Sequence, residues 1–534
     1  MGKLWFGGTM YTLQDEGQTV EGMYTENGKI VAMGEISTLE SVYKNKITER
    51  IDLQRNTLFP GFVDSHMHLI GHGEKLIRLD LSRFTSKKSV LNAVKEEAER
   101  LHEGEWLIGE GWNENLWEVP ESIHRHEIDD IVPEHPVVLK RICRHAMIVN
   151  TQAMNTAGIT ETTACPTGGV IEKDANGTLS GLLKDKAQEL LLTVIPEVSE
   201  EYLVRAIDAS INDLYSLGLT GAHTEDLHYY GGFERTFKAF KSVIEEAGMK
   251  FRAHLLVHHE VIDDMVCTGG SFLAGNEWLE FGAMKIFADG ALGGRTALLS
   301  EPYHDDPTTT GVAIFSQEKL NELVAKAREH EIPVAVHAIG DLAFELILNA
   351  IERHPLKGNG RDRLIHAQIL REDLLERANK LPLILDIQPR FLASDYPWVI
   401  DRIGLERMEY CYAWKSLINA GMHCAGGSDA PIEPADPLLG IHAAVTRTNP
   451  EDPAKKVYQP EQVLTVYEAI SLFTKGSAFA ASHEEDRGVL KEGFLADFTI
   501  FDRDLMKIPA AEILEARAVM TVIGEEIVYS NLAE

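Results

Sequence analysis

Positive charge and cysteine are both scarce in this sequence, and each shortage excludes a class of partner or fold. The chain carries 51 lysine and arginine residues against 83 aspartate and glutamate residues, so its formal net charge is -32. An acidic surface repels phosphate groups, and we therefore expect no binding to nucleic acid or to an anionic membrane. The five cysteines show no paired spacing, which argues against a disulfide framework and against a zinc knuckle.

Long apolar runs are lacking as well. No window approaches the roughly 20 apolar residues that a transmembrane helix needs. The first residues do not show a basic region, an apolar core and a cleavage site in succession, so we expect a cytoplasmic protein. With 534 residues, 44% of them hydrophobic and 25% charged, the chain has the profile of a globular protein with more than one domain.

The pattern of strands and helices predicts how the chain is organised. Residues 203–484 alternate short apolar runs with amphipathic helical segments, which is typical of a parallel sheet covered by helices. Together with the run in residues 59–74 this makes eight strands, and we predict an α/β fold, a (β/α)8 TIM-like barrel. Residues 75–202 would then be an insertion subdomain that follows the first barrel strand and covers the active site. Short strands in 1–58 and 485–534 predict one composite β-sandwich domain built from both termini.

A doubly wound open sheet is the alternative arrangement for such a pattern. It is disfavoured because no glycine-rich phosphate-binding motif follows the first strand.

The stretch "PGFVDSHMHL" places two histidines, His66 and His68, on one face of a predicted strand, because side chains two residues apart point the same way. Alone, this pair is weak evidence for a metal. Four other predicted strands carry a polar residue near the end, inside an apolar run where an unpaired polar group is costly: Lys285, His337, His366 and Asp429. Since barrel strands end at one mouth, we predict that these six side chains form a single metal site.

Imidazole and carboxylate groups suit zinc and similar divalent ions. Lys285 is the informative member, because an ammonium group repels a metal and burial beside cations favours the neutral amine. A neutral amine can take up carbon dioxide, and the resulting carbamate has two oxygens that can bridge two ions. We therefore expect two Zn²⁺ per chain, joined by a hydroxide and the carbamate on Lys285. One ion would bind His66, His68 and Asp429, and the other His337 and His366.

This site predicts a mechanism. The bridging hydroxide would attack the substrate carbonyl, and the ions would stabilise the developing oxyanion. Asp429 would take the proton of the hydroxide and deliver it to the leaving nitrogen, which is a poor leaving group without it.

Five motifs in order resemble those of the amidohydrolase superfamily: "PGFVDSHMHL", "MKIFADGALGGRTALL", "PVAVHAIGDLA", "LIHAQIL" and "GGSDAP". The resemblance covers nearly the whole chain and is strongest to the amidohydrolase branch that includes N-substituted formamide deformylases. It implies a metal-dependent hydrolase of carbon-nitrogen bonds other than peptide bonds, acting on a small-molecule substrate such as a small amide or N-substituted formamide. It also implies a barrel with a composite β domain, and a homodimer.

Four further residues are candidates for lesser roles. His145 resembles a substrate-contacting histidine of this branch, with a hydrogen-bonded structural histidine as the alternative. Trp112 could line an apolar substrate pocket or simply pack. Arg295 could bind substrate or form an ion pair that holds its loop. Asp341, four residues after His337, could orient that ligand from behind.

Two other functions remain open. One is a mononuclear deaminase of a cyclic amidine or aminopurine that uses His66, His68, His337 and Asp429, with Lys285 as a bystander. Metal stoichiometry separates it from the binuclear hydrolase. The other is a non-catalytic scaffold with the same fold, which would bind no metal and hydrolyse no amide.

Overall fold

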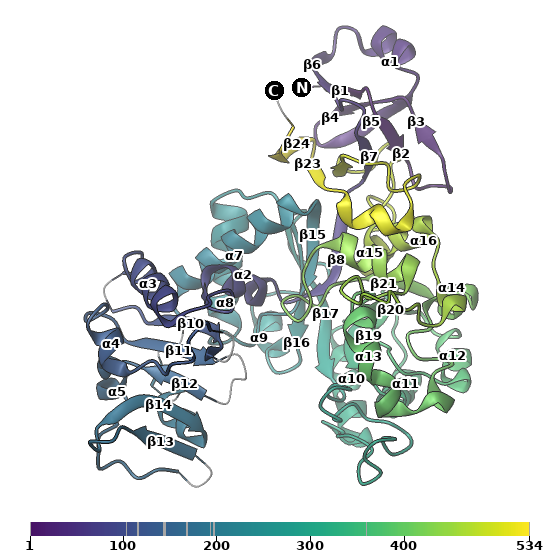
Figure 1. Cartoon of the computed structure of the whole chain (residues 1–534). Coiled ribbons are helices and arrows are strands. Elements are labelled where there is room, and N and C mark those ends of the chain that lie inside the picture. Colours follow the sequence, from purple (N-terminus) through teal and green to yellow (C-terminus); the bar gives the residue numbers. More distant parts are fainter. Residues whose placement is uncertain are drawn as a thin grey trace. The chain divides into compact units, whose positions relative to one another are not determined.

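The computed structural model describes residues 2–102, 104–114, 117–141, 146–166, 169–192, 194–195, 198–358 and 360–532. The chain forms two compact units (Figure 1). The first, Met1–Gly73 with Glu200–Glu534, is called the main unit, and the second, Glu74–Ser199, the insertion unit.

The main unit is built around an eight-stranded parallel sheet in the order β21-β20-β19-β18-β17-β16-β15-β8. These strands are the eight apolar runs of the prediction: β8 (Phe62–Met67), β15 (Leu219–Thr224), β16 (Arg252–His258), β17 (Leu279–Phe287), β18 (Val334–Ala338), β19 (Asp362–His366), β20 (Leu383–Ile387) and β21 (His423–Gly426). Past the end of β21, Asp429 N donates to His66 O at 2.8 Å, which links the last strand to the first. The predicted barrel fold is confirmed.

Helices lie along the outside of the barrel (Figure 1). In α7 (Glu200–Ser216) the buried residues Leu203, Ile207, Ile211 and Leu214 recur every three or four positions and cover β15. Burying each such side chain contributes about 1.5–3 kcal/mol. The others are α8 (Phe233–Lys241), α9 (Ile262–Cys267), α10 (Gln317–Glu329), α11 (Asp341–Arg353), α12 (Glu372–Ala378), α13 (Phe391–Ile403), α14 (Trp414–Asn419), α15 (Pro437–Thr446), α16 (Val466–Ser471) and α17 (Ser477–Ala480).

The main unit has two further sheets, one built from N-terminal strands alone and one that combines strands from both ends of the chain. One has the order β5-β4-β1-β6 and the other β24-β23-β22-β7-β2-β3. In the second, β22 (Phe498–Phe501) pairs antiparallel with β7 (Thr57–Pro60), and Trp5, Leu58 and Phe498 belong to one buried cluster. The remaining elements are β1 (Gly2–Phe6), β2 (Thr9–Tyr11), β3 (Thr19–Val20), β4 (Gly22–Glu26), β5 (Lys29–Gly34), α1 (Ile36–Tyr43), β6 (Ile47–Asp52), β23 (Ala518–Ile523) and β24 (Glu526–Ser530). The two sheets thus share a core, although the predicted domain boundaries stay a prediction.

The insertion unit contains a six-stranded sheet in the order β13-β14-β12-β11-β10-β9. Val137 and Leu139 belong to one buried cluster and Val138 to another, so both faces of the sheet are covered. Its elements are β9 (Leu79–Asp80), α3 (Lys87–Ala98), β10 (Leu107–Trp112), α4 (Arg125–Asp129), β11 (Val137–Arg141), β12 (Ala146–Val149), α5 (Thr151–Thr156), β13 (Gly169–Lys173), β14 (Leu179–Asp185) and α6 (Glu189–Leu192), while α2 (Leu69–Ile77) spans the boundary between the units. Its predicted role of covering the active site stays a prediction.

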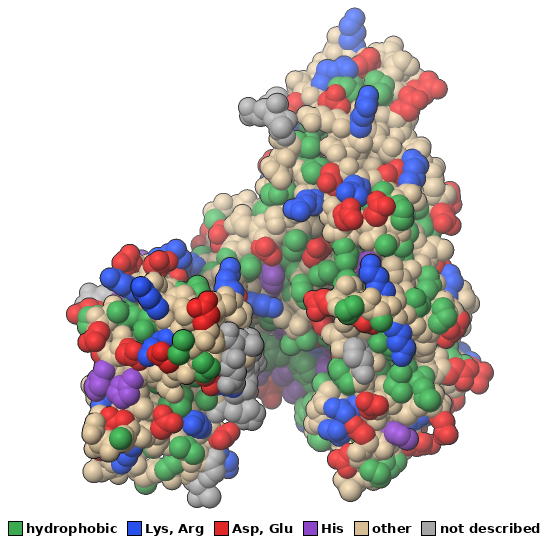
Figure 2. All heavy atoms as spheres, viewed as in Figure 1, with side chains coloured by type: hydrophobic (Ala, Val, Ile, Leu, Met, Phe, Trp, Pro, Cys, Tyr) green, Lys and Arg blue, Asp and Glu red, His purple; other side chains and the backbone are tan. Residues whose placement is uncertain are grey.

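Among the described residues, no helix has the length and apolar character needed to cross a membrane. Figure 2 shows acidic and basic side chains intermixed over the visible face of each unit.

Candidate metal centre

Three predicted ligands form a compact group at the barrel mouth, where the ligand atoms of His66, His68 and Asp429 all lie within 4.8 Å of one another. Asp429 Oδ1 is 3.5 Å from His66 Nε2 and 3.4 Å from His68 Nε2. These distances exceed the roughly 2.7–2.9 Å of a charged hydrogen bond. They match the separation of about 3.3 Å between two ligands on a tetrahedral ion with bonds of about 2.0–2.1 Å. The donor set and its spacing therefore fit a divalent metal.

The other three predicted residues adjoin this group. Lys285 Nζ lies 3.3 Å from His66 Nε2. The ring of His366 is 5.7 Å from that of His66 and 4.5 Å from that of His337, measured between centroids. The structure thus brings together all six residues that the sequence placed at strand ends.

In three of the histidines, a hydrogen bond to a carbonyl or amide oxygen determines which ring nitrogen carries the hydrogen and which one is available to a metal. A carbonyl oxygen can only accept, so the ring nitrogen beside it carries the hydrogen and the other nitrogen keeps its lone pair for a metal. The pairs are His68 Nδ1 with the Glu225 main-chain carbonyl (2.8 Å), His337 Nε2 with the Gly290 main-chain carbonyl (3.0 Å) and His366 Nδ1 with Gln388 Oε1 (2.7 Å).

Burial keeps most of these imidazoles neutral, which is the form that binds metals. It lowers the pKa of His66 and His337 well below the usual value and that of His366 to about 4. His68 differs, because burial lowers its pKa but the hydrogen bond and charge of Asp429 outweigh burial and raise it to about 9. A proton and a metal ion therefore compete for His68 Nε2.

Lys285 is fully buried at the mouth, and burial lowers the pKa of its amine. Among the described residues no carboxylate lies within ion-pair distance of Nζ, whose neighbours are His66 Nε2 and, at 4.4 Å, the Phe287 ring. This environment favours the neutral amine, the form that reacts with carbon dioxide.

Asp64 positions these ligands, and the sequence analysis missed it. Its Oδ1 accepts hydrogen bonds from His66 N (3.0 Å) and Ser428 N (3.1 Å), so it joins the end of β8 to the loop that carries Asp429. Asp429 itself has a φ of 59° and His366 a φ of 78°. Such left-handed conformations cost about 1–3 kcal/mol in non-glycine residues and cluster at functional sites. A signal was available, because Asp64 shares a strand face with His66 and His68.

The structure does not place Asp341 against His337. The Asp341 carboxylate accepts from Ser300 N (2.9 Å) and Arg371 Nη1 (2.8 Å) instead. Asp289 takes the expected position, with Oδ1 3.5 Å from His337 Nε2. It accepts hydrogen bonds from the main-chain N–H groups of Leu298 (2.8 Å), Ile339 (3.0 Å) and Gly340 (2.8 Å).

The three predicted substrate contacts have other surroundings or lie outside the described residues. Trp112 is buried in the core of the insertion unit, and its Nε1 donates to Leu139 O at 3.1 Å. Arg295 forms an ion pair with Asp305 at 2.9 Å. These arrangements match the packing and ion-pair alternatives of the sequence analysis. His145 lies outside the described residues.

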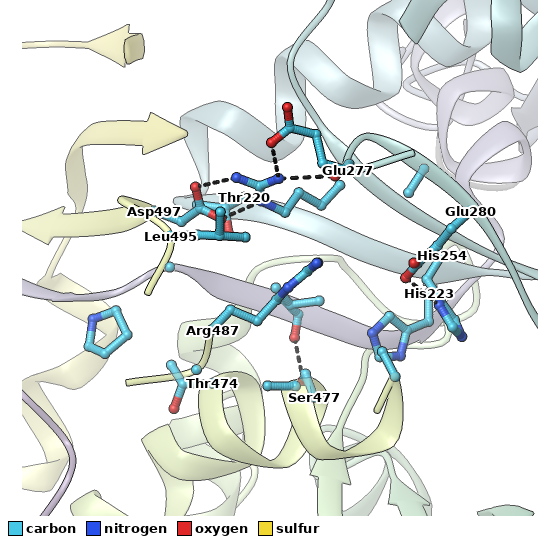
Figure 3. Close-up of a pocket in the computed structure, with 18 of the residues that line it drawn as sticks. Thr220, His223, His254, Glu277, Glu280, Thr474, Ser477, Arg487, Leu495 and Asp497 are labelled. Atoms are coloured by element: carbon cyan, nitrogen blue, oxygen red, sulfur yellow. Dashed lines mark hydrogen bonds and ion pairs between the residues drawn. The ribbon is translucent and has the colours of Figure 1, made fainter. Parts of the chain in front are cut away.

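A separate pocket lies at the opposite end of the barrel, where the strands begin (Figure 3). It is lined by Thr220, His254 and Glu280 of β15, β16 and β17 and by Asp497 near the C-terminus, among others. Its volume of about 20 Å³ is room for roughly one water molecule. This pocket is not the substrate cavity, because it is remote from the six ligands and too small for a substrate.

The barrel fold and the group of six metal-ligating side chains at its mouth are together those of a metal-dependent hydrolase. A family model described as the amidohydrolase family matches residues 49–529, and the chain belongs to this family. It is 52% identical over 531 residues to "Putative amidohydrolase YtcJ" of Bacillus subtilis (strain 168), covering 99% of this chain and 100% of that protein.

Two more distant comparisons agree with this assignment. The N-substituted formamide deformylase of Arthrobacter pascens is 24% identical over 500 residues, which is 90% of each chain. The crystal structure of a metal-dependent hydrolase from Pyrococcus furiosus superposes with a TM-score of 0.79 at 29% identity, covering 95% of this chain and 100% of that one. The chain is therefore an enzyme of the amidohydrolase family.

Proposed function

We propose that this enzyme hydrolyses a carbon-nitrogen bond other than a peptide bond in a small molecule, with a small amide or N-substituted formamide as the substrate class. The observation that carries the proposal is the position of Asp429, a carboxylate shared between two imidazoles in metal-ligand spacing. Similarity to a deformylase of N-substituted formamides supports the substrate class.

The proposed metal content is two Zn²⁺, one on His66, His68 and Asp429 and one on His337 and His366, with a carbamate on Lys285 between them. Divalent ions held there would supply Lewis acidity, which activates water and polarises a carbonyl group. The support lies in the free lone pairs of the imidazoles and in the buried amine without an acidic partner among the described residues.

Asp429 is the proposed proton carrier. Burial raises the pKa of its carboxyl group, but the hydrogen bond and charge of His68 outweigh burial, and the net pKa is lowered. The group is thus an ionised base at neutral pH. It would accept a proton from the attacking water and pass it to the departing nitrogen, so that an O–H and a C–N bond break, a C–O and an N–H bond form, and a carboxylic acid and an amine are released.

A substrate screen tests the proposal. Zinc-loaded enzyme is offered N-substituted formamides, N-acyl amines, cyclic ureides and aminopurines, with the Asp429→Asn variant as a parallel sample. We expect amine release from a formamide or other small amide by the native enzyme only. Ammonia release from an aminopurine by enzyme with one bound ion would instead establish the mononuclear deaminase. No turnover and no bound metal would establish the scaffold.

A further inference from the structure

A second group of candidate metal ligands lies at and after the ends of two neighbouring barrel strands, apart from the six ligands described above. The ligand atoms of His228, His258 and Glu260 all lie within 4.8 Å of one another. His258 ends β16, Glu260 follows it, and His228 lies in the loop after β15, the strand beside β16 (Figure 1).

The geometry of this group favours shared binding of one ion. His228 Nε2 is 3.2 Å from Glu260 Oε2, which is close to the ligand separation on a tetrahedral ion. The rings of His228 and His258 stack nearly parallel, with centroids 4.3 Å apart and an interplanar angle of 14°.

His258 is in the form that a metal requires. It is buried, and burial disfavours the charged imidazolium. Among the described residues, the His258 ring makes one hydrogen bond, in which Glu260 N donates to Nδ1 at the long distance of 3.3 Å. A hydrogen bond of this length is weak, so a cation that binds the imidazole breaks only a weak interaction.

We propose that His228, His258 and Glu260 form an additional site for a divalent transition-metal ion such as Zn²⁺ at the barrel mouth. Two imidazoles and one carboxylate are a known donor set of zinc sites that keep an open coordination position. The side chains of His228 and Glu260 are 33% and 57% exposed, so solvent reaches this position. The site is independent of the proposed substrate.

Tyr229 separates this site from the main centre. Its ring centroid lies 6.3 Å from that of His258 and 6.2 Å from that of His68, and its hydroxyl donates to Glu225 Oε2 at 2.9 Å. Because no residue belongs to both groups, variants can remove one site and leave the other.

Metal counting on the whole chain tests the proposal. Protein stripped with a chelator is dialysed against Zn²⁺, and bound zinc is measured by elemental analysis for the wild type, His228→Ala, Glu260→Gln and the control His126→Ala, an exposed histidine outside both groups. We expect His228→Ala to bind one zinc fewer than the wild type and the control. Glu260→Gln should weaken that zinc by at least about tenfold. Equal stoichiometry in the wild type and His228→Ala would overturn the proposal.

A second arm removes the main centre. The variant His66→Ala/His68→Ala should still bind one Zn²⁺, and adding His228→Ala should abolish this binding while the circular dichroism spectrum is kept. Retention of that zinc in the triple variant would place it elsewhere and overturn the assignment. If His66→Ala/His68→Ala does not fold, the comparison of singly substituted His228→Ala with the wild type decides alone.

Discussion

At the scale of single residues, Asp429 carries the sharpest prediction. Asp429→Asn keeps the size of the side chain but cannot accept a proton, so kcat should fall by about 10²-fold or more. The main chain of Asp429 remains hydrogen-bonded to His66 O, and the fold should be unchanged. Steady-state kinetics and zinc content measure the effect, with the exposed Asp15→Asn as the matched control. Near-normal kcat in Asp429→Asn would assign the proton transfer to another group.

Lys285 carries the second residue-scale prediction. If its carbamate bridges the two ions, Lys285→Ala should lose one or both of them, because alanine has no amine that could form the carbamate. A short carboxylic acid added to this variant should restore part of the activity by taking the place of the bridge. Electron density at Nζ is the direct measurement. A bare amine in an active, metal-filled crystal contradicts the carbamate and favours the mononuclear deaminase.

The six candidate ligands could be predicted from sequence because they belong to five strand ends, and parallel strands in a barrel end at one mouth. The strand face that Asp64 shares with His66 and His68 indicates its location but not its hydrogen-bond partners, and Asp289 has no such signal. Their partners are main-chain N–H groups far along the chain, those of Ser428 for Asp64 and of Ile339 and Gly340 for Asp289. Main-chain donors have no signature in a sequence, whereas closeness along the chain favours Asp341 as the partner of His337.

At the scale of elements, the loop after β17 depends on Asp289. Its buried carboxylate satisfies three main-chain N–H groups, two of them next to the start of α11, and lies beside His337. Asp289→Ala would leave these donors without a partner and should lower the free energy of unfolding by about 3 kcal/mol. It should also weaken metal binding through loss of the orientation of His337.

Urea unfolding and zinc titration measure the two effects of Asp289→Ala. The control is Asp305→Ala, which removes a carboxylate from the same loop. Asp305 forms partly exposed ion pairs with Arg295 and Arg402, which together should contribute about 1 kcal/mol or less. Similar unfolding curves for the two variants would contradict the role given to Asp289.

The barrel elements were predictable because continuous apolar runs alternate with amphipathic helices, and each run is buried on both faces. The element-scale details were not. The loop after β21 is joined to β8 by hydrogen bonds to the main-chain oxygen of His66 and to the carboxylate of Asp64. A hydrophobic pattern contains no information about such contacts.

At the scale of the whole main unit, ionic contacts connect the barrel to the segment that leads back to the terminal sheets. Glu280 of β17 is 3.0 Å from His483 Nε2 and 2.9 Å from His254 Nδ1. Arg252 lines the small pocket described above and pairs with Asp497, with Nη2 donating to Oδ1 at 2.9 Å. These charges are largely buried, so removal of one partner is expected to be costly.

This network gives the main unit a distinct pH dependence. Burial raises the pKa of Glu280, but its hydrogen bonds to His254 and His483 outweigh burial and lower the pKa far below the model-peptide value of 4.5. Burial lowers the pKa of His483, but Asp486 and Glu280 outweigh it and raise the pKa above 6.5. The contribution of Glu280 to the free energy of unfolding is present above pH 4.5 and is lost as pH falls towards its lowered pKa in the folded state. The contribution of His483 is present below pH 6.5 and is lost as pH rises through its raised pKa in the folded state. The pair therefore stabilises most between these two values.

Glu280→Gln should lower the free energy of unfolding by about 3 kcal/mol in this window, and the difference from the wild type should shrink below it and above it. Glu277→Gln is the matched control, because Glu277 lies in the same segment, 58% exposed, and its ion pair with Arg252 is long at 3.7 Å. Unfolding free energies measured by urea titration at several pH values give the comparison. A difference between Glu280→Gln and the wild type that does not change with pH would show that the glutamate acts through packing, since only a coupled pair of charges loses its contribution at both ends of the range.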